Sequence, residues 1–212
     1  MDQFIFILEI IGTCAFAISG AVVSIKKHLD IFGVLFCSII TALGGGVIRD
    51  ILLANLPPVM FSNYIYAIFA VSSALLTFVF ACFVKNSYES KFKHIDRINN
   101  IFDAIGLGVF TIVGINTALS LGYTDNPFFV IFLGMTTGCG GGLLRDILVR
   151  EVPFILTEKI YAIASIFGGI VYYVMVAVLQ LDPFLSVICG ITLIFLTRII
   201  SSIFHWDLPK AI

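Results

Sequence analysis

The 212-residue chain is 60% hydrophobic and only 12% charged, with a mean hydropathy of +1.11. A water-soluble domain of this length needs a larger polar surface than these residues provide. The net charge of −1 gives no reason to expect a nucleic-acid partner. The five cysteines stand singly inside apolar stretches, so we expect no disulfide framework, no metal site and no cofactor.

Seven apolar stretches predict an all-α integral membrane protein. About 20 apolar residues in a helix cross a hydrocarbon core of about 30 Å. Proline and Asn-Pro or Asp-Pro pairs mark several of the links, and the first stretch has neither the basic start nor the cleavage site of a signal peptide. We therefore expect seven retained spans, at 3–25, 31–54, 63–84, 99–121, 127–150, 157–179 and 183–204.

The basic residues predict the orientation of these spans. If the N-terminus lies on side A, eleven basic residues fall on side B and Arg49 alone on side A. The positive-inside rule then predicts that the N-terminus lies outside and the C-terminus in the cytoplasm. We expect a multi-pass protein of the inner (plasma) membrane. The residues on side B are Lys26, Lys27, Lys85, Lys91, Lys93, Arg97, Arg145, Arg150, Lys159, Arg198 and Lys210.

A duplication is visible in the sequence. Residues 41–57 (TALGGGVIRDILLANLP) match 137–153 (TGCGGGLLRDILVREVP) at nine of 17 positions. Upstream, Glu9, Gly12, Phe16 and Gly20 fall opposite Asp103, Gly106, Phe110 and Gly114, and downstream IYAI recurs at 65–68 and 160–163. Such a constant register indicates an internal repeat.

Each copy contains three spans, so the second copy enters the membrane from the opposite face. We expect an inverted 3+3 repeat, with the first unit at 1–88, the second at 89–180, and the seventh helix with the C-terminal tail at 181–212. Inverted repeats of this kind commonly place a solute path at their interface near the middle of the bilayer.

Glycine triplets lie inside spans two and five, at Gly44, Gly45 and Gly46 and at Gly140, Gly141 and Gly142. Each glycine costs a helix interior about 1 kcal/mol relative to alanine, so a triplet favours a kink or a break. The carbonyl groups freed by a break can replace waters on a small cation. The alternative is that the glycines only let helices approach closely.

Ionisable residues within the spans are candidates for a vestibule. They are Glu9, Arg49 and Asp50 in the first repeat and Asp103, Arg145 and Asp146 in the second. Such groups are costly in a membrane and usually face the bundle interior. We expect each arginine to pair with an acid across the repeat interface and line a vestibule; a pair that only fixes the fold is an equal alternative.

Neutral polar residues on the same spans can supply oxygens along a path, although each alone is more often a helix–helix hydrogen bond. The candidates for the path are Ser19, Thr41, Asn116 and Thr137. The sequence has no HExxH motif and no phosphate-binding loop, and its three histidines share no face. We therefore do not expect an enzyme.

GGGVIRD and GGGLLRD, in spans two and five of seven with short proline-containing links behind them, resemble the prokaryotic branch of the trimeric intracellular cation (TRIC) channels. The resemblance covers essentially the whole chain. It implies a homotrimer in the membrane lipid, with a pore for K⁺, Na⁺ and other monovalent cations in each subunit. The pore would run between the two repeats, past glycine kinks matching 44–46 and 140–142.

The resemblance also leaves alternatives open. Animal members bind a phosphoinositide near the fifth span, where this chain offers Arg145 and Arg150. The same duplicated unit is described as a glycine-transporter domain, so a carrier for a small amino acid such as glycine is the second hypothesis. A scaffold of packed helices that transports nothing is the third.

Overall fold

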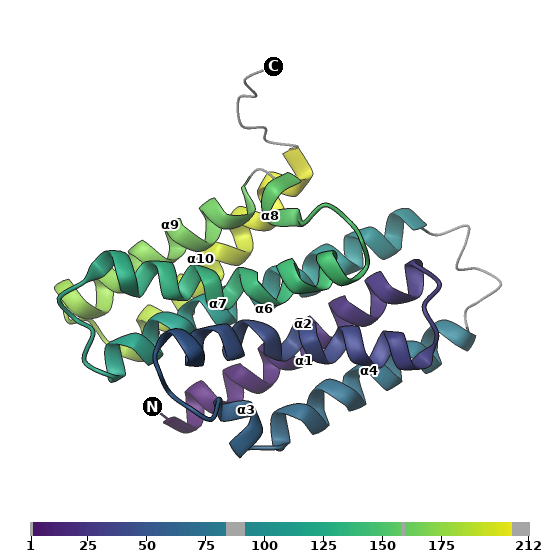
Figure 1. The fold of residues 1–212 in the computed structure, drawn as a ribbon. Coiled ribbons are helices and arrows are strands. Elements are labelled where there is room, and N and C mark those ends of the chain that lie inside the picture. The colour runs from purple at the N-terminus through teal and green to yellow at the C-terminus, as the bar shows by residue number, and fades with distance from the viewer. Residues whose placement is uncertain (1, 84–91, 158–159, 205–212) are drawn as a thin grey trace.

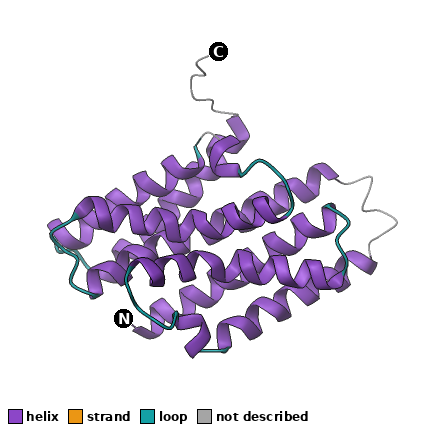
Figure 2. Ribbon diagram, in the orientation of Figure 1, coloured by secondary structure: helices purple, strands orange, loops and turns teal. Residues whose placement is uncertain are grey.

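The computed structural model describes residues 2–83, 92–157 and 160–204. Within these ranges the chain forms helices joined by short links, and seven helices are long and apolar enough to cross a membrane (Figures 1 and 2). This confirms the predicted all-α, seven-span architecture. The helices are α1 (Asp2–Lys26), α2 (Ile31–Leu52), α3 (Val59–Ser62), α4 (Ile65–Phe83), α6 (Phe92–Ser120), α7 (Pro127–Leu148), α8 (Phe154–Thr157), α9 (Tyr161–Tyr173) with its π-helical continuation η2 (Val174–Val178), and α10 (Pro183–Phe204).

Most helix boundaries follow the punctuation seen in the sequence. Asp30 caps α2 by accepting from the Gly33 N–H, and Asn126 caps α7, which begins with Pro127, by accepting from the Phe129 N–H. The fourth span differs from the prediction, because α6 begins at Phe92, inside the link of 85–98 between the predicted third and fourth spans. The predicted linker residues Lys85 and Lys91 lie outside the described residues.

The core of the bundle is made by α1, α2, α6 and α7, which pack against one another in a closed group. The α4 helix lies on the outside of α1 and α2, whereas α9 packs on α7, α6 and α10 (Figure 1). Many large apolar side chains on the periphery are exposed, including Phe80 and Phe83 on α4 and Phe184 on α10. An apolar surface of this extent fits hydrocarbon and not water.

The chain alternates direction, so helix ends gather at two faces. Face A carries the start of α1 and the end of α2, and face B carries the end of α1, the start of α6 and the end of α7. Two ion pairs join elements at face B: Lys26 with Asp96 at 2.6 Å, and Lys27 with Glu151 at 2.5 Å.

Candidate functional site

The glycine triplets mark the place where α2 and α7 cross. A Cβ atom at Gly45 would overlap the carbonyl oxygen of Thr137, and one at Gly141 would overlap the carbonyl oxygen of Thr41. Both helices run without interruption through their triplets. A break at either triplet is therefore wrong, while the kink that the sequence equally allowed stays a prediction. The glycines permit backbone-to-backbone contact between the two helices.

A first cluster, near face A, contains Glu9, Arg49, Asp50 and Tyr66. Asp50 Oδ1 accepts from Arg49 Nε at 2.8 Å, and Arg49 Nη1 lies 3.7 Å from Glu9 Oε1. The Tyr66 hydroxyl donates to Glu9 Oε2 at 2.5 Å. Asp50 Oδ2 accepts from the N–H of Val59, which begins α3. Asp50 thus fixes both the arginine and the link that follows α2.

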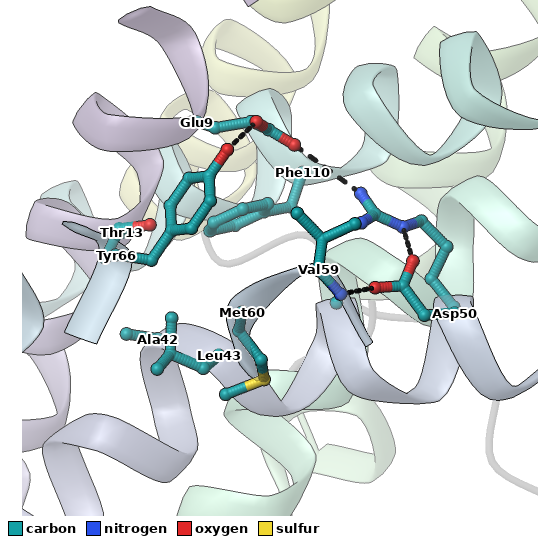
Figure 3. Close-up of a pocket in the computed structure, with 11 residues that line it drawn as sticks. Glu9, Thr13, Ala42, Leu43, Asp50, Val59, Met60, Tyr66 and Phe110 are labelled. Carbon is teal, nitrogen blue, oxygen red and sulfur yellow. Dashed lines mark hydrogen bonds and ion pairs between the residues drawn. The ribbon is translucent and has the colours of Figure 1, made fainter. Parts of the chain in front are cut away.

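An open pocket lies against this cluster. Its lining includes the whole first cluster together with Thr13, Gly46 and Phe110 (Figure 3). A Cβ atom built on Gly46 would meet nothing within 4 Å, so this glycine borders open space. The formal charges of Glu9, Arg49 and Asp50 sum to −1, which makes the pocket a favourable environment for a cation.

A second cluster, near face B, contains Asp103, Arg145, Asp146 and Tyr161. These residues fall at the positions that match the first cluster in the repeat. Asp146 Oδ1 accepts from Arg145 Nε at 2.8 Å, and Asp146 Oδ2 accepts from the N–H of Phe154, the first residue of α8. The Arg–Asp pair therefore performs the same two tasks in both repeats.

The second cluster is sealed, unlike the first. Arg145 Nη1 lies 2.7 Å from Asp103 Oδ1, and the side chains of both residues are 0% exposed. Arg145 Nη1 also donates to Ser19 Oγ at 2.5 Å, and Ser19 donates to Asn99 Oδ1 at 2.8 Å. This chain of contacts ties α7 to α1 and α6 and leaves no solvent-exposed surface on the ion pair.

The seventh helix adds a contact that the repeat does not predict. Arg198 of α10 is 1% exposed; its guanidinium lies 4.8 Å from the centre of the Tyr161 ring and donates to Asn100 Oδ1 at 2.8 Å. The sequence interpretation used Arg198 only as evidence for orientation. Tyr66 and Tyr161 are matching residues of the repeat, but nothing in the sequence indicated that the Tyr66 hydroxyl bonds Glu9.

The ion pairs differ from the expectation in one respect. Each arginine pairs with acids of its own repeat, Arg49 with Glu9 and Asp50, and Arg145 with Asp103 and Asp146. The prediction of ion pairs across the repeat interface is wrong. The reason is the topology, because the acid-bearing first helix of each unit packs beside the second helix of the same unit. Of these two arginines, Arg145 also bonds across the repeats, by donating to Ser19 Oγ.

The predicted polar path residues lie in separate places. Thr41 and Thr137 stand at the glycine crossing, where each donates to the carbonyl four residues earlier in its own helix, at 2.7 and 2.6 Å. Ser19 belongs to the second cluster. Asn116 lies toward the other end of α6 and accepts from the Tyr172 hydroxyl at 3.2 Å. The structure thus brings Ser19 to a charged cluster and leaves Asn116 apart.

Two phenylalanines separate the clusters. Phe16 and Phe110 occupy matching positions in the repeat, and their rings stack with centroids 5.4 Å apart. Phe110 lines the pocket of the first cluster, whereas the Phe16 ring packs against Gly106 and lies 3.5 Å from a Cβ built on Gly141. An apolar pair therefore lies beyond the pocket, on the way to the second repeat. Throughout 2–83, 92–157 and 160–204, no group of three or more His, Cys, Asp or Glu side chains is placed to hold a metal ion.

Comparison with known proteins identifies the family. The sequence model of the Gly_transporter family, described as glycine transporter, matches residues 6–81 and 100–177. The inner membrane protein YadS of Escherichia coli K12 is 34% identical over 95% of this chain and 93% of its own length. The solved structure of a prokaryotic TRIC channel in 0.5 M KCl is 36% identical, covers 98% of this chain and 100% of its own, and superposes with a TM-score of 0.84.

The chain is a member of the TRIC family. The TRIC orthologue from Rhodobacter sphaeroides, which is 30% identical over 96% of this chain and 100% of its own, superposes with a TM-score of 0.85. YvgT of Bacillus subtilis, a membrane protein of the same UPF0126 group as YadS, is 32% identical over 96% of the chain and 95% of its own length. These likenesses confirm the family resemblance and the fold, and the solved TRIC structures are those of channels and not of enzymes.

Proposed function

We propose that the protein is a channel for monovalent cations, K⁺ and Na⁺ among them, with a path in each subunit between the two repeats. The observation that carries this proposal is the placement of two matching Arg–acid clusters at opposite faces, with the glycine crossing and the Phe16–Phe110 stack between them. Solved members of the family are cation channels, which supports the same conclusion.

The proposed path begins in the pocket at face A, where the net charge of −1 favours cations over anions. It passes Gly46, Leu43 and the stacked phenylalanines and reaches face B beside Gly142 and the second cluster. In this conformation the path is closed at its second end, because the Arg145–Asp103 pair is fully buried.

Recording from purified protein in planar bilayers tests the proposal. We expect unitary current steps whose reversal potential follows the K⁺ gradient, and whose shift under opposed KCl and NaCl gives the selectivity. Absence of steps, together with absence of cation flux from vesicles, would exclude a channel.

The second candidate is a carrier for a small amino acid such as glycine. The favouring observation is that the pocket presents a carboxylate and a guanidinium 3.7 Å apart, so the ammonium and carboxylate groups of a zwitterion each find an opposite charge. Saturable, gradient-driven glycine uptake without unitary steps would establish this function in place of a channel. If neither glycine uptake nor ionic current is observed, the scaffold hypothesis remains.

We also infer the arrangement in the cell. The duplicated units are taken as 1–88 and 89–180, with 181–212 outside the duplication, and the protein as a homotrimer in contact with membrane lipids. The basic bias of side B supports a cytoplasmic face B. A reporter fused after Ile212 should be active only in the cytoplasm and one fused after Tyr123 only outside, and native mass spectrometry should show a trimer.

A further inference from the structure

The two clusters are made of residues at matching positions of the repeat, but their hydrogen bonds and their exposure differ. The arrangement seen in one cluster is therefore a guide to an alternative arrangement of the other. In the first cluster the tyrosine hydroxyl bonds the acid at 2.5 Å, the arginine stands 3.7 Å from that acid, and a pocket is open beside Gly46. In the second cluster the arginine holds the acid at 2.7 Å and the site is sealed. The open state thus coincides with a Tyr–acid bond, and the closed state with a tight Arg–acid pair.

The sealed cluster contains polar atoms that have no partner. Within the described residues, Tyr161 Oη, Asp103 Oδ2 and Arg145 Nη2 are buried and accept or donate no hydrogen bond. The three side chains lie around Gly142: a Cβ built there would lie 3.1 Å from the unpaired Tyr161 Oη, 3.7 Å from the unpaired Arg145 Nη2 and 3.6 Å from Asp103 Oδ1, the oxygen bonded to Arg145. Unpaired buried groups are unfavourable, so this state is held against a cost. A Tyr161–Asp103 hydrogen bond would satisfy two of the three atoms, and it is the bond that the first cluster already makes.

We propose that the second cluster has an open state in which the Tyr161 hydroxyl donates to Asp103, Arg145 withdraws, and a pocket opens to face B beside Gly142. Tyr161 is then a positioning residue that stabilises the open end of the path. Two halves of an inverted repeat can each adopt the conformation of the other, which makes the first cluster a direct guide to this state. The inference rests on the proposed function only where it treats the opening as a gate for ions.

The contacts that keep the second cluster closed lie outside the repeated pattern. Ser19, which accepts from Arg145 and donates to Asn99, falls opposite Val113 in the other repeat, so the first cluster lacks this contact. Arg198 reaches Tyr161 from α10, and α10 has no counterpart in the first repeat. Removal of Ser19 Oγ therefore weakens the closed state alone, while loss of the Tyr161 hydroxyl weakens the open state alone.

A native cysteine reports on the opening. Cys139 is 2% exposed, and its matching residue in the first repeat, Leu43, lines the open pocket. In the proposed open state Cys139 lines the new pocket and becomes reactive. The protein is reconstituted in lipid nanodiscs with Cys14, Cys37, Cys82 and Cys189 replaced by alanine, and the rate of Cys139 modification by a small water-soluble methanethiosulfonate is measured.

Three variants of this background decide the question. Asp103→Glu supplies the longer acid of the first cluster and should raise the modification rate at least threefold. Addition of Tyr161→Phe should cancel that gain, and Ser19→Ala should raise the rate by a factor of two or more. The matched control is Leu43→Cys with Cys139→Ala, which should react faster than Cys139 does in the parent background and at the same rate in all three variants. Elution as an intact oligomer shows that each variant is folded.

The proposal is overturned if neither Asp103→Glu nor Ser19→Ala changes the rate, or if the gain from Asp103→Glu survives Tyr161→Phe. Cys139 labelling involves no ion flux, so this experiment tests the opening independently of the proposed channel function. If the labelling rates change as expected but no currents are recorded, the channel is rejected and the opening stands. If currents are recorded but the labelling rates do not change, the opening alone is rejected.

Discussion

The cluster around Arg49 and the cluster around Arg145 share their residue types, their spacing and their two backbone contacts. They differ in what surrounds them: Glu9 of the first cluster lies beside a pocket and its side chain is 17% exposed, while the second cluster is enclosed by Ser19 and Asn99 on one side and by Arg198 of α10 on the other. Arg49 and Asp50 are themselves buried, so the first cluster is open on its Glu9 side alone, whereas the Arg145 and Asp103 side chains are 0% exposed. The contacts from Ser19 and Arg198 that enclose the second cluster have no equivalent around the first.

The largest difference should appear when the arginines are removed. Arg145→Ala leaves Asp103 and Asp146 buried and without their cation, a loss that typically costs about 3–5 kcal/mol. Arg49→Ala should cost less, because it leaves one fully buried acid, Asp50, without its cation, whereas Glu9 is 17% exposed beside the pocket and can be hydrated. Thermal unfolding in detergent should place the Arg145 variant well below the Arg49 variant. Equal losses would show that the two environments are energetically alike, and would remove the basis of the comparison.

Much of this architecture could be predicted from the sequence. The seven spans, the duplication and the charged residues of both clusters follow from hydropathy and register, because lipid demands long apolar helices and makes every buried charge conspicuous. The Asn126-Pro127 pair likewise marks the start of α7.

The errors have a common origin in packing. Judged by helix propensity alone, a glycine triplet weakens a helix. Only the position of the partner helix shows that Gly45 and Gly141 lie at a backbone contact between α2 and α7. The acid that pairs with Arg145 depends on which helices are neighbours, and the pocket beside Glu9 depends on how α1, α2 and α4 pack together. These features depend on which helices are neighbours and not on local residue spacing. The sequence therefore identified the candidate residues but not their partners or their exposure.

Alanine substitutions in the triplets should separate contact from conformation. Helix propensity alone predicts a gain of up to about 1 kcal/mol for each Gly→Ala change. At Gly45 and Gly141 the new methyl would overlap a backbone carbonyl, which cannot rotate away, so overpacking of about 1–3 kcal/mol per site should prevail. We expect the melting temperature of Gly45→Ala with Gly141→Ala to fall by several degrees.

The matched control for the triplets is Gly46→Ala, whose methyl would enter open space and should leave stability unchanged or slightly raised. Its counterpart Gly142→Ala meets Tyr161 Oη at 3.1 Å and should fall between the two. The order Gly46, Gly142, Gly45 plus Gly141 tests whether space decides the outcome. If Gly46→Ala destabilises as much as the double variant, the first repeat is not open beside Gly46.

The smallest effect concerns the ion pairs at face B. Lys27 and Glu151 lie 2.5 Å apart, but both side chains are 38% exposed, and those of Lys26 and Asp96 are 37% and 58% exposed. Exposed pairs contribute at most about 1 kcal/mol and are screened by salt.

The matching positions in the other repeat are Leu121 and Asn55, so face A has no such pair at that place. Lys27→Gln should therefore lower the melting temperature by only a degree or two at low ionic strength, with the difference disappearing near 1 M KCl. Lys26→Gln is the control and should behave alike or more mildly. A large loss of melting temperature for Lys27→Gln that does not depend on salt would mean that surface ion pairs hold face B closed. The buried contacts of Ser19 and Arg198 would then not suffice to explain why the second cluster is sealed and the first is not.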